Sequence, residues 1–268
     1  MTPDIAPVVT DWLVKALSVR PGDRVLEVAG GSGTVAFVTA GAAPSVYVIC
    51  TDVELRAVSS GVRRYRAASR DSFDRVDERS RMAFAAADMH RLPFVRYEFD
   101  SVVCRWGFMF ASSPVDALAE AARVLRPGGR LAFAVWGPPD ENPWQALLDR
   151  ALEAAGIDRS SQLRAGGMFA LADESVVRDV VARAQLCVDV VERVSLVRRY
   201  RDFAEYWSTE VAWIESPAIL RGGRAIDIAA LRRRLEEDLS QYRALSGYEI
   251  RGLNLAIAAT RPHTAARL

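Results

Sequence analysis

Several residue types that carry chemistry are scarce in this chain of 268 residues. It has two histidines and three cysteines, and its single lysine is Lys15. The cysteines, Cys50, Cys104 and Cys187, are widely spaced and lie in or beside apolar runs, which argues against a disulfide framework or a zinc site. We therefore expect no metal centre and a reducing, cytoplasmic location.

Long apolar segments and an excess of one charge are absent as well. The formal net charge is +1, so bulk electrostatics favour neither a nucleic acid nor a membrane surface as partner. No apolar stretch approaches the roughly 20 residues that a helix needs to cross a bilayer, and the first residues lack the basic segment of a signal peptide. Half of the residues are hydrophobic and 26% are charged, which is typical of a globular protein.

Apolar runs alternate with segments of helical periodicity in the first half of the chain. This alternation predicts βαβ units and a parallel sheet with buried strands. The predicted strands span 24–28, 46–51, 82–87, 101–105 and 130–136, and the predicted helices span 8–17, 34–42, 54–68 and 115–125. Later elements are helices over 143–155, 173–184, 201–214 and 225–243 and strands over 186–197 and 253–259. The charge-rich segment 70–81 is expected to be a solvated loop or helix face.

A strand that runs into glycines and then into a helix spans Val25–Thr34, with the sequence VLEVAGGSGT. Such a turn creates a crevice at the carboxyl edge of an α/β sheet, where ligands bind. Gly31 and Gly33 lack side chains, so a ligand can approach the main chain closely. The segment also satisfies a relaxed dinucleotide fingerprint, with Asp52 at a suitable distance to hold a ribose. From this segment alone, a nicotinamide cofactor is an open alternative.

Two carboxylates favour a different ligand. Glu27 stands at the end of the first strand, where an anion suits a ligand with an ammonium and a sulfonium and repels a pyrophosphate. Asp88 ends the third strand, where a carboxylate can accept a hydrogen bond from an adenine amino group. A tight turn, LRPGGRL over 125–131, then leads into the fifth strand.

Taken in order, these segments resemble the class I S-adenosylmethionine-dependent methyltransferases, in the group named after ubiquinone and menaquinone biosynthesis (methyltransferase type 11). The resemblance rests on Val25–Thr34, Thr51-Asp52, Ala87–Phe94, Phe99–Arg105, Arg123–Gly129, Val135–Pro138 and Asn142–Trp144. It implies a Rossmann-like, doubly wound α/β fold with a seven-stranded sheet in the order 3-2-1-4-5-7-6 and an antiparallel last strand. We expect a single methyltransferase domain over 1–268, with a cofactor-binding core over 8–136 and helical insertions over 140–170 and 197–249 that cover the acceptor.

The resemblance also implies which residues hold the methionyl part of S-adenosylmethionine. Glu27 and the main chain of Gly31 and Gly33 would surround it, and the main chain near Arg105 would receive its ammonium. Ala29 departs from the family's pattern, which has a glycine there, and we expect it to be tolerated provided that its φ is negative. Relatives often carry an additional N-terminal lid, so we expect either a more open site here or a natural chain that starts earlier than this sequence.

The adenosine part has its own implied residues. Asp52 would bind the ribose hydroxyls, and Val53 would pack on the adenine. Asp88 and the main chain of Met89 would read the edge of the adenine. His90 follows directly, and it is a candidate general base, although packing beside the adenine is the favoured interpretation.

Aromatic side chains cluster in two places where an acceptor could bind. Trp106 and Phe108 follow the fourth strand, and we expect them to wall a hydrophobic pocket, with plain core packing as the alternative. Among the later aromatics, Trp144 is a pocket candidate for which a scaffold role is favoured. Tyr206 and Trp207 either pack helices or line the acceptor pocket, and both interpretations stay open. For the pair 198–199, a solvated pair of arginines is favoured over a grip on an acidic acceptor.

The predicted reaction is methyl transfer to a hydrophobic or aromatic small molecule in specialised metabolism. A sulfonium is already activated, so positioning the acceptor can supply much of the acceleration. One alternative is a methyltransferase fold that uses the cofactor structurally in a cyclisation or rearrangement. The other is an NAD-dependent oxidoreductase. No motif indicates which acceptor atom is methylated or how the chain assembles.

Overall fold

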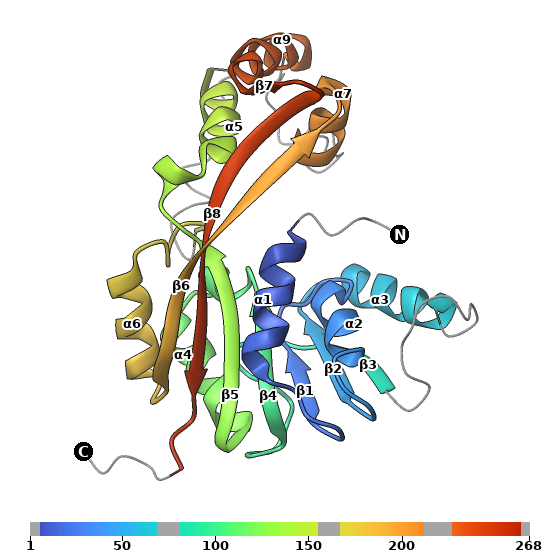
Figure 1. The fold of residues 1–268 in the computed structure, drawn as a ribbon, viewed down its shortest axis with the longest axis vertical. Helices are drawn as coiled ribbons and strands as arrows, with labels where there is room; N and C mark the ends of the chain where they lie inside the picture. The colour runs from blue at the N-terminus through green and yellow to red at the C-terminus, as the bar shows by residue number, and fades with distance from the viewer. Residues whose placement is uncertain (1–5, 69–80, 155–166, 212–226, 264–268) are drawn as a thin grey trace. The chain divides into compact units, whose positions relative to one another are not determined.

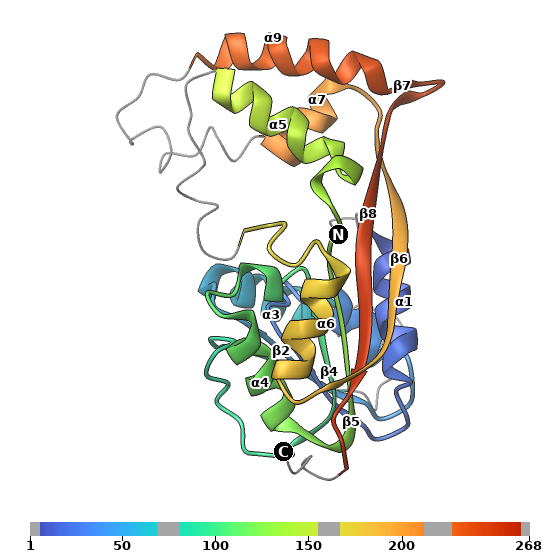
Figure 2. The same cartoon turned by 90° about the vertical axis from the view of Figure 1, so that its left-hand side faces the viewer.

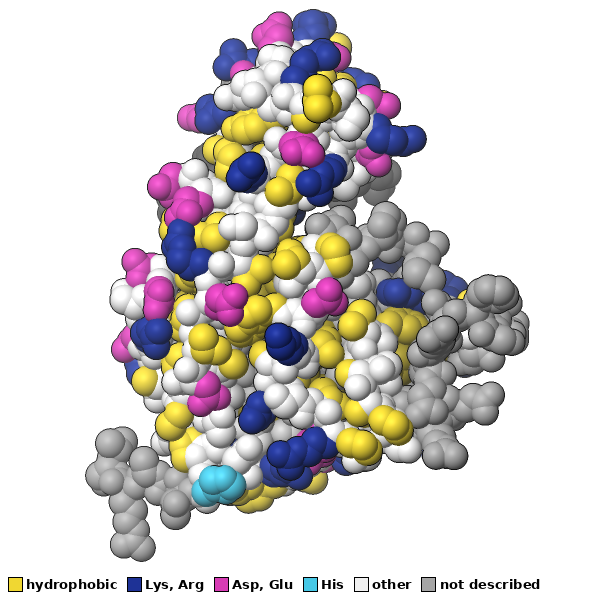
Figure 3. Space-filling view, in the orientation of Figure 1, with side chains coloured by type: hydrophobic (Ala, Val, Ile, Leu, Met, Phe, Trp, Pro, Cys, Tyr) yellow, Lys and Arg dark blue, Asp and Glu magenta, His cyan; other side chains and the backbone are white. Residues whose placement is uncertain are grey.

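The computed structural model describes residues 6–68, 81–154, 167–211 and 227–263 (Figure 1). Its centre is an eight-stranded sheet in the order β3-β2-β1-β4-β5-β8-β6, with β7 paired to β8. Within this described part, no helix is long and apolar enough to cross a membrane. Basic and acidic side chains are mixed over the face shown in Figure 3, as expected for a chain with almost balanced charge.

The strands follow the predicted order. They are β1 (Arg24–Glu27), β2 (Tyr47–Asp52), β3 (Arg81–Ala86), β4 (Phe99–Arg105), β5 (Leu125–Trp136), β6 (Cys187–Tyr200), β7 (Arg243–Ala244) and β8 (Gly247–Thr260). The first five are parallel, whereas β8 runs antiparallel to β5. The Rossmann-like fold and the antiparallel last strand are therefore confirmed. The two-residue β7 was not predicted, because so short a strand leaves no periodicity.

The helices also lie where the periodicity places them. They are α1 (Pro7–Leu17), α2 (Thr34–Ala40), α3 (Leu55–Ala68), α4 (Pro114–Val124), α5 (Pro143–Ala154), α6 (Glu174–Arg183), α7 (Phe203–Tyr206) and α9 (Ile228–Leu239). Helix α4 begins as its sequence suggests: Pro114 is its first residue, and the Ser113 side chain accepts a hydrogen bond from the Asp116 N–H. Over 201–214, the expected single helix is α7 followed by a π-helical turn, Trp207–Val211, and 212–214 lie outside the described residues. Of the segment 70–81, only Arg81 is described, and it begins β3.

Contacts divide the chain into two compact units. Unit 1 comprises Met1–Trp136, Ala165–Val194 and Asn254–Leu268, and unit 2 comprises Gly137–Arg164 and Ser195–Leu253. In unit 1, α1 packs on one face of the sheet against β4 and β5, and α4 and α6 lie on the other face (Figure 2). The predicted acceptor cover over 140–170 and 197–249 falls mostly within unit 2, and its role stays a prediction.

One side chain organises the start of unit 2. Asn142 is fully buried, and its Nδ2 donates to the carbonyls of Gly137, Pro138 and Leu253, each at 3.0 Å. Its Oδ1 accepts hydrogen bonds from the Leu253 N–H at 3.0 Å and from Trp144 Nε1 at 3.2 Å. Every polar atom of this buried amide is therefore satisfied, which is the usual state of a structural asparagine.

Candidate functional site

Residues predicted for the cofactor and for the acceptor lie at the carboxyl ends of four neighbouring parallel strands. Asp52 ends β2, whereas Ala29, Asp88 and Trp106 come shortly after β1, β3 and β4. Parallel strands place such residues at one edge, where open α/β sheets bind ligands. The topology therefore brings the segments singled out from the sequence together.

The glycine loop after β1 is fixed by main-chain hydrogen bonds. Gly30 N–H donates to the Thr51 carbonyl and Gly33 N–H to the Gly30 carbonyl, both at 2.9 Å. Gly31 has a φ of +59°, and a Cβ built on it meets nothing within 4 Å, so the space beside it is open. The main chain of this loop can therefore be approached closely, as the sequence predicts.

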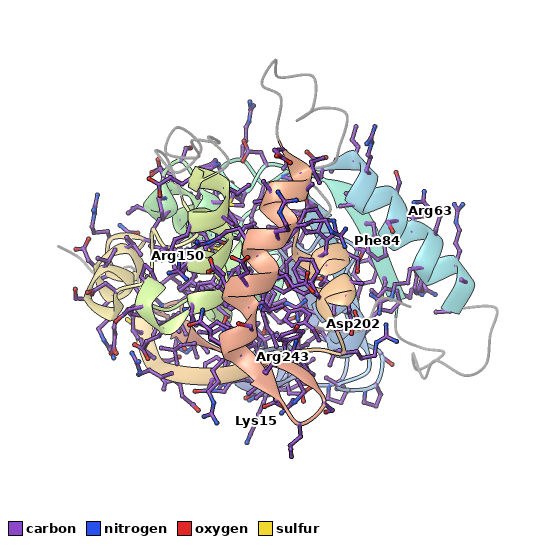
Figure 4. All side chains as sticks on the ribbon, turned by 90° about the horizontal axis from the view of Figure 1, so that it is seen from above. Lys15, Arg63, Phe84, Arg150, Asp202 and Arg243 are labelled. Carbon is purple, nitrogen blue, oxygen red and sulfur yellow. The ribbon has the colours of Figure 1, made fainter. Side chains whose placement is uncertain are left out.

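The loop also depends on an aromatic residue beneath it. Gly33 has a φ of +83° and lies against the Phe84 ring, and Gly61 of α3 faces the same ring. Phe84 lies beside α3, whose Arg63 points outward (Figure 4). The two glycines thus leave room for one aromatic ring between the loop and α3.

Glu27 lies under the loop in a fully buried position. Its Oε2 accepts a hydrogen bond from Ala36 N–H at 2.9 Å, near the start of α2. Burial raises the pKa of Glu27 from its ordinary value of 4.5 to about 7, although a hydrogen bond from the Cys50 thiol and the nearby Arg105 partly oppose this. A Cβ on Gly30 would stand 2.5 Å from Glu27 Cδ and from Cys50 Sγ, so only glycine fits above this carboxyl. A neighbouring cation would favour the ionised form of this side chain.

The backbone of Ala29 does not have the negative φ that was expected from the sequence. Its φ is +52°, not negative, so alanine occupies a backbone conformation that normally favours glycine. Its methyl group is accommodated by Gly107, on which a Cβ would stand 2.5 Å from Ala29 Cβ. The loop after β1 and the loop after β4 are therefore in direct contact at this point.

Asp52 is held firmly at the end of β2. Its Oδ2 accepts a hydrogen bond from Gly31 N–H at 2.8 Å, and its Oδ1 accepts one from Glu54 N–H at 2.9 Å. The next residue, Val53, is an apolar side chain with 69% of its surface exposed. A fixed carboxylate beside an exposed apolar group suits a ribose and a planar base, which is the role implied for these residues.

Asp88 is linked to His90 and to the loop before α4. Asp88 Oδ1 accepts hydrogen bonds from the N–H of His90 and from its Nδ1, both at 2.9 Å. These bonds lower the pKa of the Asp88 carboxyl. On the other side of the ring, Nε2 is 3.2 Å from Ser112 Oγ and accepts a weak bond from Ser113 N–H. The His90 ring therefore joins two loops, and Met89 lies half-buried between Asp88 and His90.

Arg105 points its side chain toward α1. Its Nη1 donates to Thr10 Oγ1 at 2.5 Å, and its guanidinium lies 4.8 Å from the centre of the Trp106 ring. Sequence reasoning missed Thr10, since nothing in the pattern of α1 distinguishes it from other buried helix residues. The implied role of the Arg105 main chain stays a prediction.

Trp106 and Phe108 differ in their burial, although only one residue separates them in the sequence. Trp106 is partly buried and stacks on Trp136, with ring centres 4.5 Å apart and planes at 15°. Phe108 is completely buried and meets Phe133 edge-on at 5.5 Å. Phe108 is therefore a core residue and does not wall an open pocket, because its ring fills the space between the β4 loop and β5.

The late aromatic residues pack within unit 2. Tyr206 and Trp207 are buried next to Phe203, and their role at an acceptor stays a prediction. Trp144 is buried under the Arg198 guanidinium, 3.9 Å from its ring centre.

The two consecutive arginines of β6 have different surroundings. Arg198 is buried, and its Nη1 is 2.7 Å from Glu210 Oε2, which corrects the expectation of a solvated pair. Glu210 also accepts a hydrogen bond from the Tyr200 hydroxyl at 2.8 Å. Arg199 is exposed and pairs with Glu249.

Metal ligands do not converge in the described ranges, where no group of three or more His, Cys, Asp or Glu side chains could hold an ion.

Comparisons with known proteins agree with this arrangement. Residues 26–133 match the model of a methyltransferase domain. The chain is 38% identical over 132 residues to a demethylmenaquinone methyltransferase of Beutenbergia cavernae, covering 49% of this chain and 48% of that protein. It is 36% identical over 140 residues to a ubiquinone/menaquinone biosynthesis C-methyltransferase of Paracoccus denitrificans, covering 52% and 51%. The chain thus spans about half the length of these curated relatives.

Solved structures share the fold at low sequence identity. Geranyl diphosphate C-methyltransferase from Streptomyces coelicolor has a TM-score of 0.54 at 15% identity, with 95% of this chain and 80% of that chain covered. The [4+2]-cyclase SpnF has a TM-score of 0.62 at 17% identity, with coverage of 97% and 82%.

The left-handed backbone of Ala29 predicts that glycine stabilises this position. An L-residue in that conformation costs roughly 1–2 kcal/mol, and glycine's larger loss of entropy offsets part of it, so Ala29→Gly should raise the free energy of unfolding by about 0.5–1 kcal/mol. Urea denaturation measures the change. The control is Ala119→Gly on the exposed face of α4, which should lower stability by about 1 kcal/mol. A loss of stability in Ala29→Gly would contradict the strained backbone.

The raised pKa of Glu27 predicts a pH-dependent stability. Below the unfolded-state pKa of 4.5, the carboxyl is protonated in both the folded and the unfolded protein. As the pH rises through the folded-state pKa of about 7, the stability that the protonated carboxyl gives the folded protein is lost. The penalty at high pH is on the order of 3 kcal/mol. Glu27→Gln stays neutral and keeps an acceptor for Ala36 N–H.

The measurement is the free energy of unfolding of both proteins between pH 5 and pH 8. The variant should gain stability relative to the wild type as the pH rises through this window. Parallel curves would show that Glu27 does not titrate there.

Proposed function

We propose that residues 26–133, which match the model of a methyltransferase domain, form an S-adenosylmethionine-dependent domain of the ubiquinone/menaquinone type, and that this chain methylates a hydrophobic or aromatic small molecule. The names of the curated relatives favour an acceptor of the quinone type over the specialised metabolite expected from the sequence. The chain spans about half of those relatives, so the acceptor belongs to the proposal.

The observation that carries the proposal is the geometry of Asp52. Two main-chain N–H groups, from Gly31 and Glu54, fix its carboxylate at the end of β2. A carboxylate oxygen has more than one lone pair, so Asp52 can accept ribose hydroxyls while it keeps both bonds. The open space beside Gly31 and the exposed Val53 flank it. These residues therefore fit the adenosine part of the cofactor.

The charge of the site favours S-adenosylmethionine over a dinucleotide. Glu27 is a buried acid beneath the glycine loop, and its ionisation is favoured when a cation arrives nearby. The ammonium and sulfonium of S-adenosylmethionine are cations, whereas a pyrophosphate would be repelled by this carboxyl. The Asp88 carboxylate offers an acceptor for an adenine amino group on a neighbouring strand end.

The chemistry demands little from side chains. When bound, S-adenosylmethionine would supply a methyl group on a sulfonium, which is already activated for transfer to a nucleophilic acceptor atom. The protein then has to hold the acceptor in line and exclude water. His90 already contacts Asp88 and Ser112 and accepts a bond from Ser113, so we propose a structural role for it and methyl transfer mainly by positioning.

Substitution of Asp52 tests the cofactor site. Asp52→Ala should weaken binding of S-adenosylmethionine by about 1–3 kcal/mol, the usual value of hydrogen bonds to a charged group. The matched control is Asp23→Ala, because Asp23 precedes β1 at the amino edge of the sheet and accepts a hydrogen bond from Arg20 N–H. Calorimetric titration of wild type and both variants, with circular dichroism as the check on folding, measures the effect. Equal dissociation constants for the Asp52 variant and the wild type would remove Asp52 from the ribose site.

A further inference from the structure

Asn254 of β8 is a buried amide with one half unpaired. It is completely buried, and its Nδ2 has no hydrogen-bond partner among the described residues. In Asn142, the buried amide of unit 2, the same atom has three carbonyl oxygens at 3.0 Å to accept its two hydrogens. Native proteins pair almost all buried polar groups, so an unpaired buried donor requires an explanation.

The orientation of the Asn254 amide is fixed by Trp106. An indole Nε1–H can only donate, and it lies 2.6 Å from Asn254 Oδ1. The carbonyl half of the amide therefore faces Trp106, and the NH₂ half is directed elsewhere. A rotation of the amide by 180° would place two donors against each other, so the unpaired nitrogen does not result from a reversed assignment.

Trp106, which donates the hydrogen bond to Asn254, has a strained backbone conformation. Its φ is +61°, in the left-handed region that is rare for an aromatic residue. Its N–H donates to the Ala134 carbonyl at 2.8 Å, and its ring stacks on Trp136. Residues kept in such conformations cluster at functional sites, where the surrounding structure maintains them.

The amide lies at the edge of the sheet that carries the cofactor residues. Asn254 pairs in register with Trp136, the last residue of β5. Trp106 follows β4 at the same edge, and its neighbour Gly107 lies directly against Ala29 of the glycine loop. A continuous path of contacts thus links the loop proposed to hold the methionyl group to the amide of Asn254.

We propose that Asn254 is a specificity-determining residue that donates a hydrogen bond from Nδ2 to an oxygen of an aromatic acceptor, next to the atom that receives the methyl group. The assignment rests on the proposed function. A donor bound to the attacking atom itself would reduce its nucleophilicity, so the bonded oxygen is a neighbour of that atom, as in a phenol methylated on ring carbon. The nitrogen has no exposed surface here, so the acceptor oxygen replaces atoms that now cover it.

The test compares two probes of almost the same size, 1-naphthol and naphthalene, titrated into the full chain with saturating S-adenosylhomocysteine. The wild type should bind 1-naphthol about tenfold more tightly, the upper range for one hydrogen bond. Asn254→Leu removes the donor, and Asn254→Asp keeps an acceptor for Trp106 but cannot donate when ionised. Both variants should lose the preference for 1-naphthol while they keep their affinity for S-adenosylhomocysteine.

Ala119→Gly is the structural control, because Ala119 lies on the exposed face of α4 and its replacement weakens the helix. It should lower the thermal midpoint clearly and leave the preference for 1-naphthol intact in the folded protein. An unchanged preference for 1-naphthol in either Asn254 variant would overturn the role of Asn254. A wild type that binds S-adenosylhomocysteine without preferring 1-naphthol would overturn it as well. Failure of the wild type to bind S-adenosylhomocysteine would instead overturn the proposed function.

Discussion

The buried carboxyl of Glu27 is the contact around which the candidate site is built. It ends β1, accepts a hydrogen bond from Ala36 near the start of α2, and lies so close under Gly30 that no side chain fits there. Burial of this acid raises its pKa to about 7, so the protein maintains a group whose charge is unfavourable in the absence of a cation. The need for glycine at position 30 follows from this one side chain.

The loops around this carboxyl are strained and support one another. Ala29 and Trp106 both have positive φ angles, and they belong to the loops after β1 and β4. These loops meet where the Ala29 methyl group lies against Gly107, so neither can relax without displacing the other. Strain of this kind persists when packing over-determines the backbone. The contact keeps the loops after β1 and β4 in a fixed relation.

The fold was predictable from the sequence because its signals are local. Apolar runs and helical periodicity located the strands and helices along the chain, and the glycines after β1 located the carboxyl edge. The order of the strands in the sheet was implied by the resemblance to class I methyltransferases. Glu27, Asp52 and Asp88 could be singled out because each lies at the end of a strand or just after it, so topology alone brings them together. The remaining features depend on distant contacts: Trp106 bonds to a residue 148 positions away, and Arg105 to one 95 positions away. The periodicity of apolar residues cannot predict the φ of Ala29, the burial of Phe108 or the unpaired amide of Asn254.

The central claim is that the carboxyl edge of this sheet binds S-adenosylmethionine and not a dinucleotide. Parallel calorimetric titrations of the purified protein with S-adenosylhomocysteine and with NAD test it most directly. The product of methyl transfer carries the same adenosine and ammonium groups, so we expect saturable binding of S-adenosylhomocysteine and no detectable heat with NAD. Saturable binding of NAD without binding of S-adenosylhomocysteine would contradict the account.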